Sequence, residues 1–211
     1  MKHHVFRSLT VPLLALGLIG ITGCATVVLP QGPDLTSLAP LTDVPTIAVP
    51  KPADAREKPR RAGSIGLAAL SLKADPSNLI AREAVAALHG RRLNGDLIPV
   101  AADDLPRQLE EVARRQAHGT LVITMKDISI QSFDALLDAP AATVTLEASL
   151  YAPDGNLLGR GTASGRAQHR INTFALNRTS GALIVEAAHQ ALEHLVSRST
   201  IAGALNQLRI E

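Results

Sequence analysis

The chain has 211 residues with a formal net charge of +2, and aromatic residues make up only 2% of it. Its aliphatic residues are enough for one core, and its length suits one domain. Nucleic-acid binding usually needs a concentrated basic face and stacking aromatic rings, so no nucleic acid is expected as a partner.

The first 23 residues are typical of a bacterial lipoprotein signal peptide. They begin with basic residues, continue with an apolar run over residues 11–21, and lead into Ile21-Thr22-Gly23-Cys24. These four residues resemble the lipobox that the lipoprotein signal peptidase recognises. The apolar run has about half of the roughly 20 residues that a membrane-spanning helix needs, and small residues precede the cleavage point. The alternatives are a secretory signal followed by a chance cysteine, and a spanning helix.

Cys24 is the predicted lipidation site. The resemblance implies a diacylglyceryl thioether on its sulfur, cleavage before it, and often a third acyl chain on the new amine. Cys24 is the only cysteine, so no disulfide can form within the chain. Lipidation also removes an exposed thiol, which would be a liability in an oxidising compartment. Two or three acyl chains anchor a protein stably, because each buried CH₂ contributes about 0.8 kcal/mol.

The mature chain is predicted to face the periplasm from the outer membrane. By analogy with Gram-negative sorting, alanine rather than aspartate at position 25 favours the outer membrane. Cleavage removes Lys2 and Arg7, so the 21 basic residues fall to 19 and equal the 19 acidic ones. The expected partners are the membrane, through the acyl chains on Cys24, and other envelope proteins. The sequence leaves the oligomeric state open.

Residues 24–44 are predicted to form the lipid anchor and a Pro-rich tether, followed by a single α+β domain over residues 45–211. Seven of the 13 prolines fall between residues 25 and 62, and proline removes hydrogen-bond donors and favours extended chain. Residues 46–49 form a β-branched run that predicts the first strand of the domain. Residues 53–62 indicate a solvated polar loop, with weak attraction to anionic lipid head groups as the alternative.

Two helices are predicted in the middle of the chain. The first is predicted to have Asp75 as its cap and Pro76 at its first helical position. An apolar stripe follows, and Asn94-Gly95 is expected to stop the helix. A short edge strand is expected over residues 98–100, because its proline argues against a central place. The second helix is predicted to start at Asp103-Asp104 and to end at Gly119. Its inward residues are expected to be Leu105, Leu109, Val112 and Ala113.

The second half of the chain predicts long strands. Residues 120–133 read as one strand, and its apolar residues change phase near Lys126-Asp127, which predicts a bulge. Residues 142–151 alternate between apolar and polar, as in a half-buried antiparallel strand. Asp154-Gly155 predicts a turn into a return strand that ends near Ala167.

A long helix is predicted after the return strand. The glycines at 159, 161 and 165 miss the dinucleotide-binding pattern, so we expect strand bends there. Thr179-Ser180 is expected to cap the helix, and residues 200–211 to form a further short helical piece. The helix has a wide apolar face, made by Leu183, Ile184, Ala187, Ala188, Ala191, Leu192, Leu195 and Val196.

Together these elements predict an α+β fold, with a mostly antiparallel sheet and helices packed on one face. Their order resembles the YajG-like family of small Gram-negative envelope lipoproteins: a lipobox, a Pro-rich segment, a short strand with Asp54-Ala55-Arg56, a helix, strands at 121–123 and 142–151, a Gly-rich return strand and a helix. The resemblance covers nearly all of the mature chain and implies an envelope lipoprotein without assigned enzymatic residues. Auxiliary lipoproteins of lipid-transport systems share a similar layout.

A search for chemistry yields no candidate site besides Cys24. His189 and His194 lie five residues apart on the last helix, which places them about 140° apart around its axis. They cannot share a metal from one face, and we expect both to face solvent. The acidic pairs Asp103-Asp104 and Glu110-Glu111 are expected to be solvated charges, and no serine has the surroundings of a nucleophile elbow. We therefore predict no catalytic, cofactor-binding or metal-ligating residues, and no cofactor.

The function that the sequence favours is non-catalytic: a lipid-anchored adaptor or assembly factor of the outer envelope. The first alternative is a lipid-handling accessory protein, which needs an apolar groove between sheet and helices. The second is a periplasmic hydrolase, which needs a buried acid–base pair.

Overall fold

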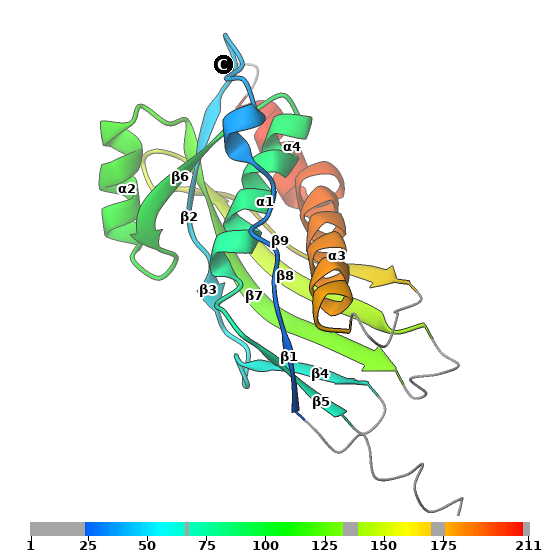
Figure 1. Ribbon diagram of the computed structural model, residues 1–211. Helices are drawn as coiled ribbons and strands as arrows, with labels where there is room; N and C mark the ends of the chain where they lie inside the picture. The colour runs from blue at the N-terminus through cyan, green and yellow to red at the C-terminus, as the bar shows by residue number, and fades with distance from the viewer. Residues whose placement is uncertain (1–23, 66–67, 133–138, 170–175, 209–211) are drawn as a thin grey trace, which may run out of the picture.

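The computed structural model describes residues 24–65, 68–132, 139–169 and 176–208 (Figure 1). In these residues one nine-stranded mixed sheet packs against four α-helices, which confirms the predicted α+β class. The strands are β1 (Cys24–Val27), β2 (Thr46–Lys51), β3 (Ala53–Asp54), β4 (Arg61–Ile65), β5 (Ala68–Leu72), β6 (Asn94–Ala101), β7 (Gly119–Ser132), β8 (Ala141–Tyr151) and β9 (Leu157–Gln168). The helices are α1 (Ser77–Gly90), α2 (Leu105–Arg114), α3 (Leu176–Arg198), α4 (Thr200–Gln207) and the short 3₁₀ helix η1 (Leu35–Ser37). Within the described ranges, no helix is long and apolar enough to cross a membrane.

β7 is the central strand of the sheet. Along one edge it pairs antiparallel with β8, which pairs antiparallel with β9. Along its other edge it pairs in succession with β2, β3 and β4, which all run parallel to it. β6 lies outside β2, while β5 and then β1 lie outside β4. Most of the paired length is antiparallel, as predicted, because the β7–β8 and β8–β9 ladders are the longest.

Two buried prolines explain why β7 meets short strands along this edge. β2 pairs with β7 only at Ile47 and Ala48. Pro50 and Pro52 follow and are both buried. Proline has no N–H to donate to a ladder, so the pairing stops there and resumes at Ala53 in β3.

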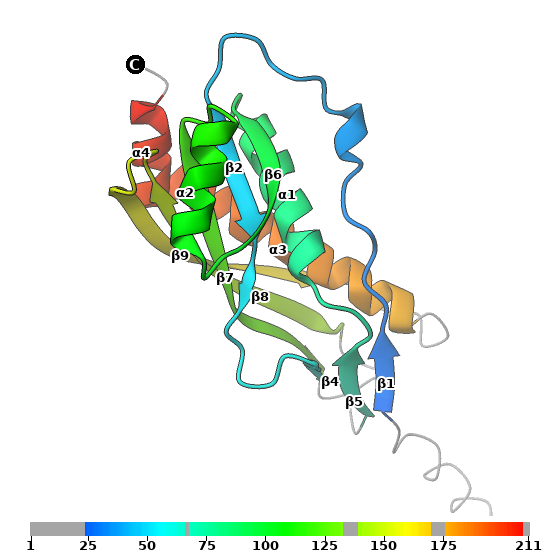
Figure 2. The same ribbon diagram turned by 90° about the vertical axis from the view of Figure 1, so that its left-hand side faces the viewer.

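The helices lie on both faces of the sheet, with α1, α3 and α4 on one face and α2 on the other (Figure 2). The two faces of β2 contact different cores, because successive residues of a strand point to opposite faces of the sheet. Ile47 and Val49 belong to the main core, whereas Ala48 lies in a small second cluster with Val112 of α2. The prediction of helices on one face therefore holds except for α2, which covers apolar residues of β2 and β6.

α3 packs on the sheet through the predicted face. All eight of its predicted apolar residues are 1% exposed or less. The helix lies so close to β9 that a Cβ on Gly165 would stand 1.9 Å from the carbonyl oxygen of Ala187. The approach is less close at Gly159 and Gly161, where a Cβ would stand 3.1 Å from Thr200 and Ser199 at the start of α4. These glycines therefore make room for the helices, which is a different reason from the strand bends that we predicted.

Three local predictions for the long strands are confirmed. The register of the β7–β8 ladder shifts between Met125 and Asp127, at the predicted bulge. Alternate residues of β8 are buried along its whole length. Gly155 has φ +87° in the turn between β8 and β9, a conformation that glycine adopts without strain.

The bounds of three predicted elements differ. α1 ends at Gly90, because Arg92 takes φ 58° and turns the chain. Asn94-Gly95 therefore does not stop the helix but opens β6, an edge strand that is longer than the predicted residues 98–100. α3 begins at Leu176, so Thr179-Ser180 lies inside the helix instead of capping it.

α2 also differs from its prediction. Asp104 caps it, since its carboxylate accepts from the backbone N–H of Arg107 at 3.3 Å. The helix ends at Arg114, and Gly119 instead opens β7. Val112 is buried as expected, but Ala113 is exposed, and Gln108 takes the second buried position of the helix.

Candidate functional site

Cys24, the predicted lipidation site, is the first residue of β1. Its register partner is Ala69 of β5, and the pairing continues to Val27 and Leu72. The side chain of Val27 is completely buried. Cys24 itself is therefore paired in the sheet, and no unpaired residue lies between it and the rest of β1.

One row of register partners crosses six strands from Cys24. The row consists of Cys24, Ala69, Ser64, Gln131, Ala141 and Gln168, in β1, β5, β4, β7, β8 and β9. It marks one end of the sheet, at the bottom and lower right of Figure 1, and we call it the Cys24 end. The turn between β8 and β9 and the start of β7 lie at the opposite end.

Polar contacts hold the segment after β1 against the body. The guanidinium of Arg82 in α1 donates from Nε and Nη2 to the carbonyl oxygen of Pro33, at 2.9 and 2.6 Å. The side-chain amide of Asn94 accepts from the backbone N–H of Leu41 at 3.0 Å and donates to its carbonyl oxygen at 2.9 Å. Side chains of α1 and β6 thus bind this Pro-rich segment, which has few N–H groups for a ladder.

Apolar contacts also hold the segment. Leu29, Leu35 and Leu38 pack against the main core. At Gly181 in α3, a Cβ would stand 2.1 Å from the carbonyl oxygen of Val28, so the chain crosses the helix in close contact. The residues predicted as a tether therefore lie along the domain in the structure (Figure 2), whereas a free spacer would extend away from it.

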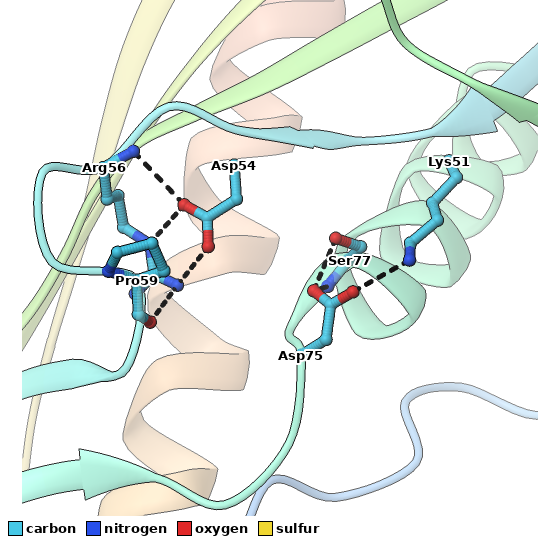
Figure 3. A network of polar contacts seen from close by, with 6 residues as sticks. All are labelled: Lys51, Asp54, Arg56, Pro59, Asp75 and Ser77. Carbon is cyan, nitrogen blue, oxygen red and sulfur yellow. Dashed lines mark hydrogen bonds and ion pairs between the residues drawn. The ribbon is translucent and has the colours of Figure 1, made fainter.

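The loop around β3 contains a buried ion pair (Figure 3). Nε and Nη2 of Arg56 donate to the Asp54 carboxylate at 2.7 and 2.6 Å, and Nη2 also donates to the carbonyl oxygen of Pro59 at 2.6 Å. The side chain of Arg56 is only 4% exposed and that of Asp54 20%. The pair closes the loop on itself, so this part of the predicted solvated loop has a buried centre. Arg60 and Arg61 are exposed, as expected.

A second polar cluster lies at the start of α1 (Figure 3). The Asp75 carboxylate accepts from the backbone N–H and the hydroxyl of Ser77, at 2.9 and 2.6 Å, and pairs with Nζ of Lys51 at 2.9 Å. Burial raises the pKa of Asp75, but the hydrogen bonds from Ser77 and Lys51 outweigh it and hold this pKa below its ordinary value. Asp75 therefore stays ionised beside the start of α1. The helix starts where we predicted to within one residue, but Pro76 is its cap residue and Ser77 its first helical residue, so Asp75, the predicted cap, lies one position before the observed cap.

Three open hollows lie near these clusters. One of about 800 Å³ lies between the loop and β7, and most of its lining residues are charged or polar, among them Arg61, Ser64 and Asp127. One of about 930 Å³ lies toward the start of α1, with Asp54, Arg60 and Asp75 in its lining. The third, of about 370 Å³, lies between α1 and β6 and has a mostly apolar lining that includes Val49, Ile98 and Val100.

The histidines of α3 differ in their surroundings. His194 is exposed, as predicted. The side chain of His189 is 48% exposed, but its Nδ1 lies 3.1 Å from Oε2 of Glu83 in α1, whose side chain is only 7% exposed. His189 thus links α1 to α3, a role that its predicted solvent-facing position did not suggest. In the part of the chain that the structure describes, no three His, Cys, Asp or Glu side chains are placed to hold a metal.

Replacing His189 with alanine is expected to lower the free energy of unfolding by about 1–3 kcal/mol, because the Glu83 carboxylate would stay buried without this partner. His194→Ala is the matched control, and its effect is expected within about 0.5 kcal/mol. Urea denaturation of the two variants measures the difference. If Glu83→Gln restores stability to the His189 variant, the buried charge is the cause; equal effects of the two histidine variants would contradict the assignment.

Other carboxylates with lowered pKa values lie in exposed ion pairs. Hydrogen bonds from Lys126 and Arg160 hold the pKa of Glu147 below its ordinary value on the face of β8 away from α3. Contacts from Arg114 and Arg115 lower the pKa of Glu111 to about 2. Each of these carboxylates is held ionised by cations, so each acts as a structural charge on the surface.

Sequence reasoning missed the residues that bind one part of the chain to another. Arg82 contacts a carbonyl 49 positions away, and His189 contacts a carboxylate 106 positions away. No local pattern marks such pairs. Only the Asp54–Arg56 ion pair left a local signal in the sequence. Its two charges lie two residues apart in a loop, and charges at this spacing can pair within a turn.

Comparison with known proteins shows likeness at the level of the fold. No family model and no curated protein sequence matches the chain. Protein XCC0632 from Xanthomonas campestris, described under the family model DUF330, superposes with a TM-score of 0.50 at 17% identity, over 87% of this chain and 99% of that one. The likeness to XCC0632 therefore concerns the fold alone.

Two further solved structures match less closely. The PelC dodecamer from Paraburkholderia phytofirmans has a TM-score of 0.47 at 14% identity, over 79% of this chain and 93% of that one. Lipoprotein GNA1162 from Neisseria meningitidis has a TM-score of 0.42 at 15% identity, over 79% and 99%. At these scores neither match carries an argument of its own.

Proposed function

We propose that the protein is a YajG-like outer-membrane lipoprotein, anchored through acyl chains on Cys24, that acts as a non-catalytic adaptor or assembly factor facing the periplasm. One observation carries the proposal: the residue that ends the lipobox is itself paired in the sheet, and its pairing continues to the buried Val27. Cleavage before Cys24 would thus leave the paired strand β1 complete at the start of the mature chain. The likeness of its fold to XCC0632 is compatible with this reading.

Cys24→Ser is expected to abolish acylation and to leave an uncleaved precursor, because serine offers no thiol for the thioether. Mass spectrometry of the membrane-extracted protein measures both outcomes. Ala25→Ser is the control, since it introduces the same side chain one position later and keeps the thiol. A wild-type protein with an unmodified mature Cys24 would refute the anchor.

Lipid handling is the second candidate, and the apolar hollow between α1 and β6 is the observation that favours it. Its volume of about 370 Å³ is at the lower end of the roughly 300–1,000 Å³ that ligand pockets span. The hollow is therefore better suited to part of an acyl chain than to a whole lipid. Lipid extraction from the purified protein, followed by mass spectrometry, distinguishes the two functions: a stoichiometric bound lipid supports the second and not the first.

A further inference from the structure

We infer that the Cys24 end of the sheet rests directly on the lipid surface, so that bilayer head groups are the partner of this end. The inference rests on the proposed acylation of Cys24 and adds the orientation and contact surface of the domain. It follows from three features of the structure: the start of β1, the course of the next residues, and the row of strand residues beside Cys24.

The first feature is the lack of a spacer. A free tether over residues 25–44 could reach about 70 Å when extended. In the structure β1 pairs with β5 from Cys24 onward, and Val27 is completely buried. An acyl chain on Cys24 would thus be attached to a paired residue of the sheet, which keeps this end of the sheet at the membrane surface.

The second feature is the course of the chain after β1. Residues 28–44 run back along α1 and α3, away from the Cys24 end (Figure 2). Arg82 and Asn94 hold them there by hydrogen bonds to backbone groups. The close approach of Gly181 to Val28 fixes the point where β1 leaves the sheet. These contacts oppose the release of the segment as a longer spacer.

The third feature is the composition of the row beside Cys24. Its six strands span about 24 Å, at roughly 4.8 Å between neighbouring strands. Ala69, Gln131 and Gln168 are exposed, while Ser64 and Ala141 are partly exposed. All five are small or neutral polar residues, so none of them opposes a charged head-group layer. The opposite end of β8 lies about 34 Å away, because ten residue steps of about 3.4 Å separate Ala141 from Tyr151.

Fluorescence quenching tests the orientation in the full lipoprotein. Acylation uses the thiol of Cys24, the only cysteine, so one added cysteine is a unique labelling site. The label is placed at Ala69→Cys or Gln131→Cys, at the Cys24 end, or at Leu157→Cys, which is 54% exposed at the far end. Each protein is reconstituted into phosphatidylethanolamine–phosphatidylglycerol vesicles that contain a lipid with a nitroxide on its head group. Quenching is expected to be several-fold stronger at positions 69 and 131 than at 157.

A variant with a spacer after Cys24 tests whether the pairing of β1 from Cys24 onward holds the Cys24 end against the lipid surface. Sixteen Gly-Ser residues inserted between Cys24 and Ala25 add a flexible link of about 22 Å. Quenching at position 69 is then expected to fall toward the value at position 157. Mass spectrometry first verifies the acyl chains. If they are absent, the proposed function fails and this inference with it. If they are present and quenching is equal at all three positions, or strongest at 157, the inference is wrong while the anchor stands.

Discussion

Leu192→Ala is expected to lower the free energy of unfolding by about 2–5 kcal/mol, because it removes buried methyl groups and leaves a cavity. Leu192 is completely buried in the face of α3 that covers the β7–β8–β9 part of the sheet. The helix touches β9 too closely to shift and fill the space, as the approach to Gly165 shows. A small domain has only about 5–15 kcal/mol of stability, so the loss will be visible in thermal or urea denaturation.

The control for Leu192→Ala is Leu157→Ala. Leu157 has the same side chain as Leu192, but it is 54% exposed at the start of β9. Its truncation is expected to change stability by less than about 0.5 kcal/mol, since surface substitutions rarely do more. A Leu192 variant as stable as the Leu157 variant would show that α3 does not pack as described.

Asp54→Ala is expected to destabilise the domain by about 3–5 kcal/mol, because it removes the partner of a buried charge. Arg56 is only 4% exposed, and its guanidinium has no comparable anion in its described contacts besides Asp54. The carbonyl oxygen of Pro59 would keep one hydrogen bond to it but no charge. Urea denaturation of the variant measures the loss.

The control is the double variant Arg60→Ala, Arg61→Ala in the same loop. Both arginines are exposed, so removing them is expected to change stability by less than about 0.5 kcal/mol. A further variant, Asp54→Ala with Arg56→Met, removes both charges and is expected to recover much of the loss. If the Arg60→Ala, Arg61→Ala double variant loses as much stability as Asp54→Ala, the loop is not organised around Arg56.

Regular alternation made the second half of the fold predictable. β8 alternates because one of its faces meets the core and the other does not, and the bulge in β7 appears in the sequence as a change of phase. The wide apolar face of α3 is visible for the same reason. β1, β4 and β5 carry no such pattern, since they are short and β4 begins with an arginine and contains a glycine. Pairing with distant strands, which local propensity does not encode, makes them strands.

The candidate site, too, could be predicted only where its signal is local in the sequence. Cys24 can be found from sequence because a peptidase reads the lipobox as a short continuous segment. Where Cys24 stands in the domain could not be read, because its pairing with Ala69 depends on a strand that the sequence did not predict. The prolines of residues 25–44 predict an extended tether, but η1 interrupts the extended chain, and proline composition does not tell whether such a segment is free or docked.

The order of the strands also determines which contacts can form early. β7, β8 and β9 follow one another in the chain and can pair as successive hairpins, with α3 directly after them. β2 must instead wait for β6 and β7, and β1 for β5. Distant pairings close long loops and form slowly, so the C-terminal meander is expected to fold first and to serve as the template for the rest. In a newly made chain β2, β3 and β4 therefore lack their partner β7 until it has emerged, and this interval is when the protein has the greatest need of protection from aggregation.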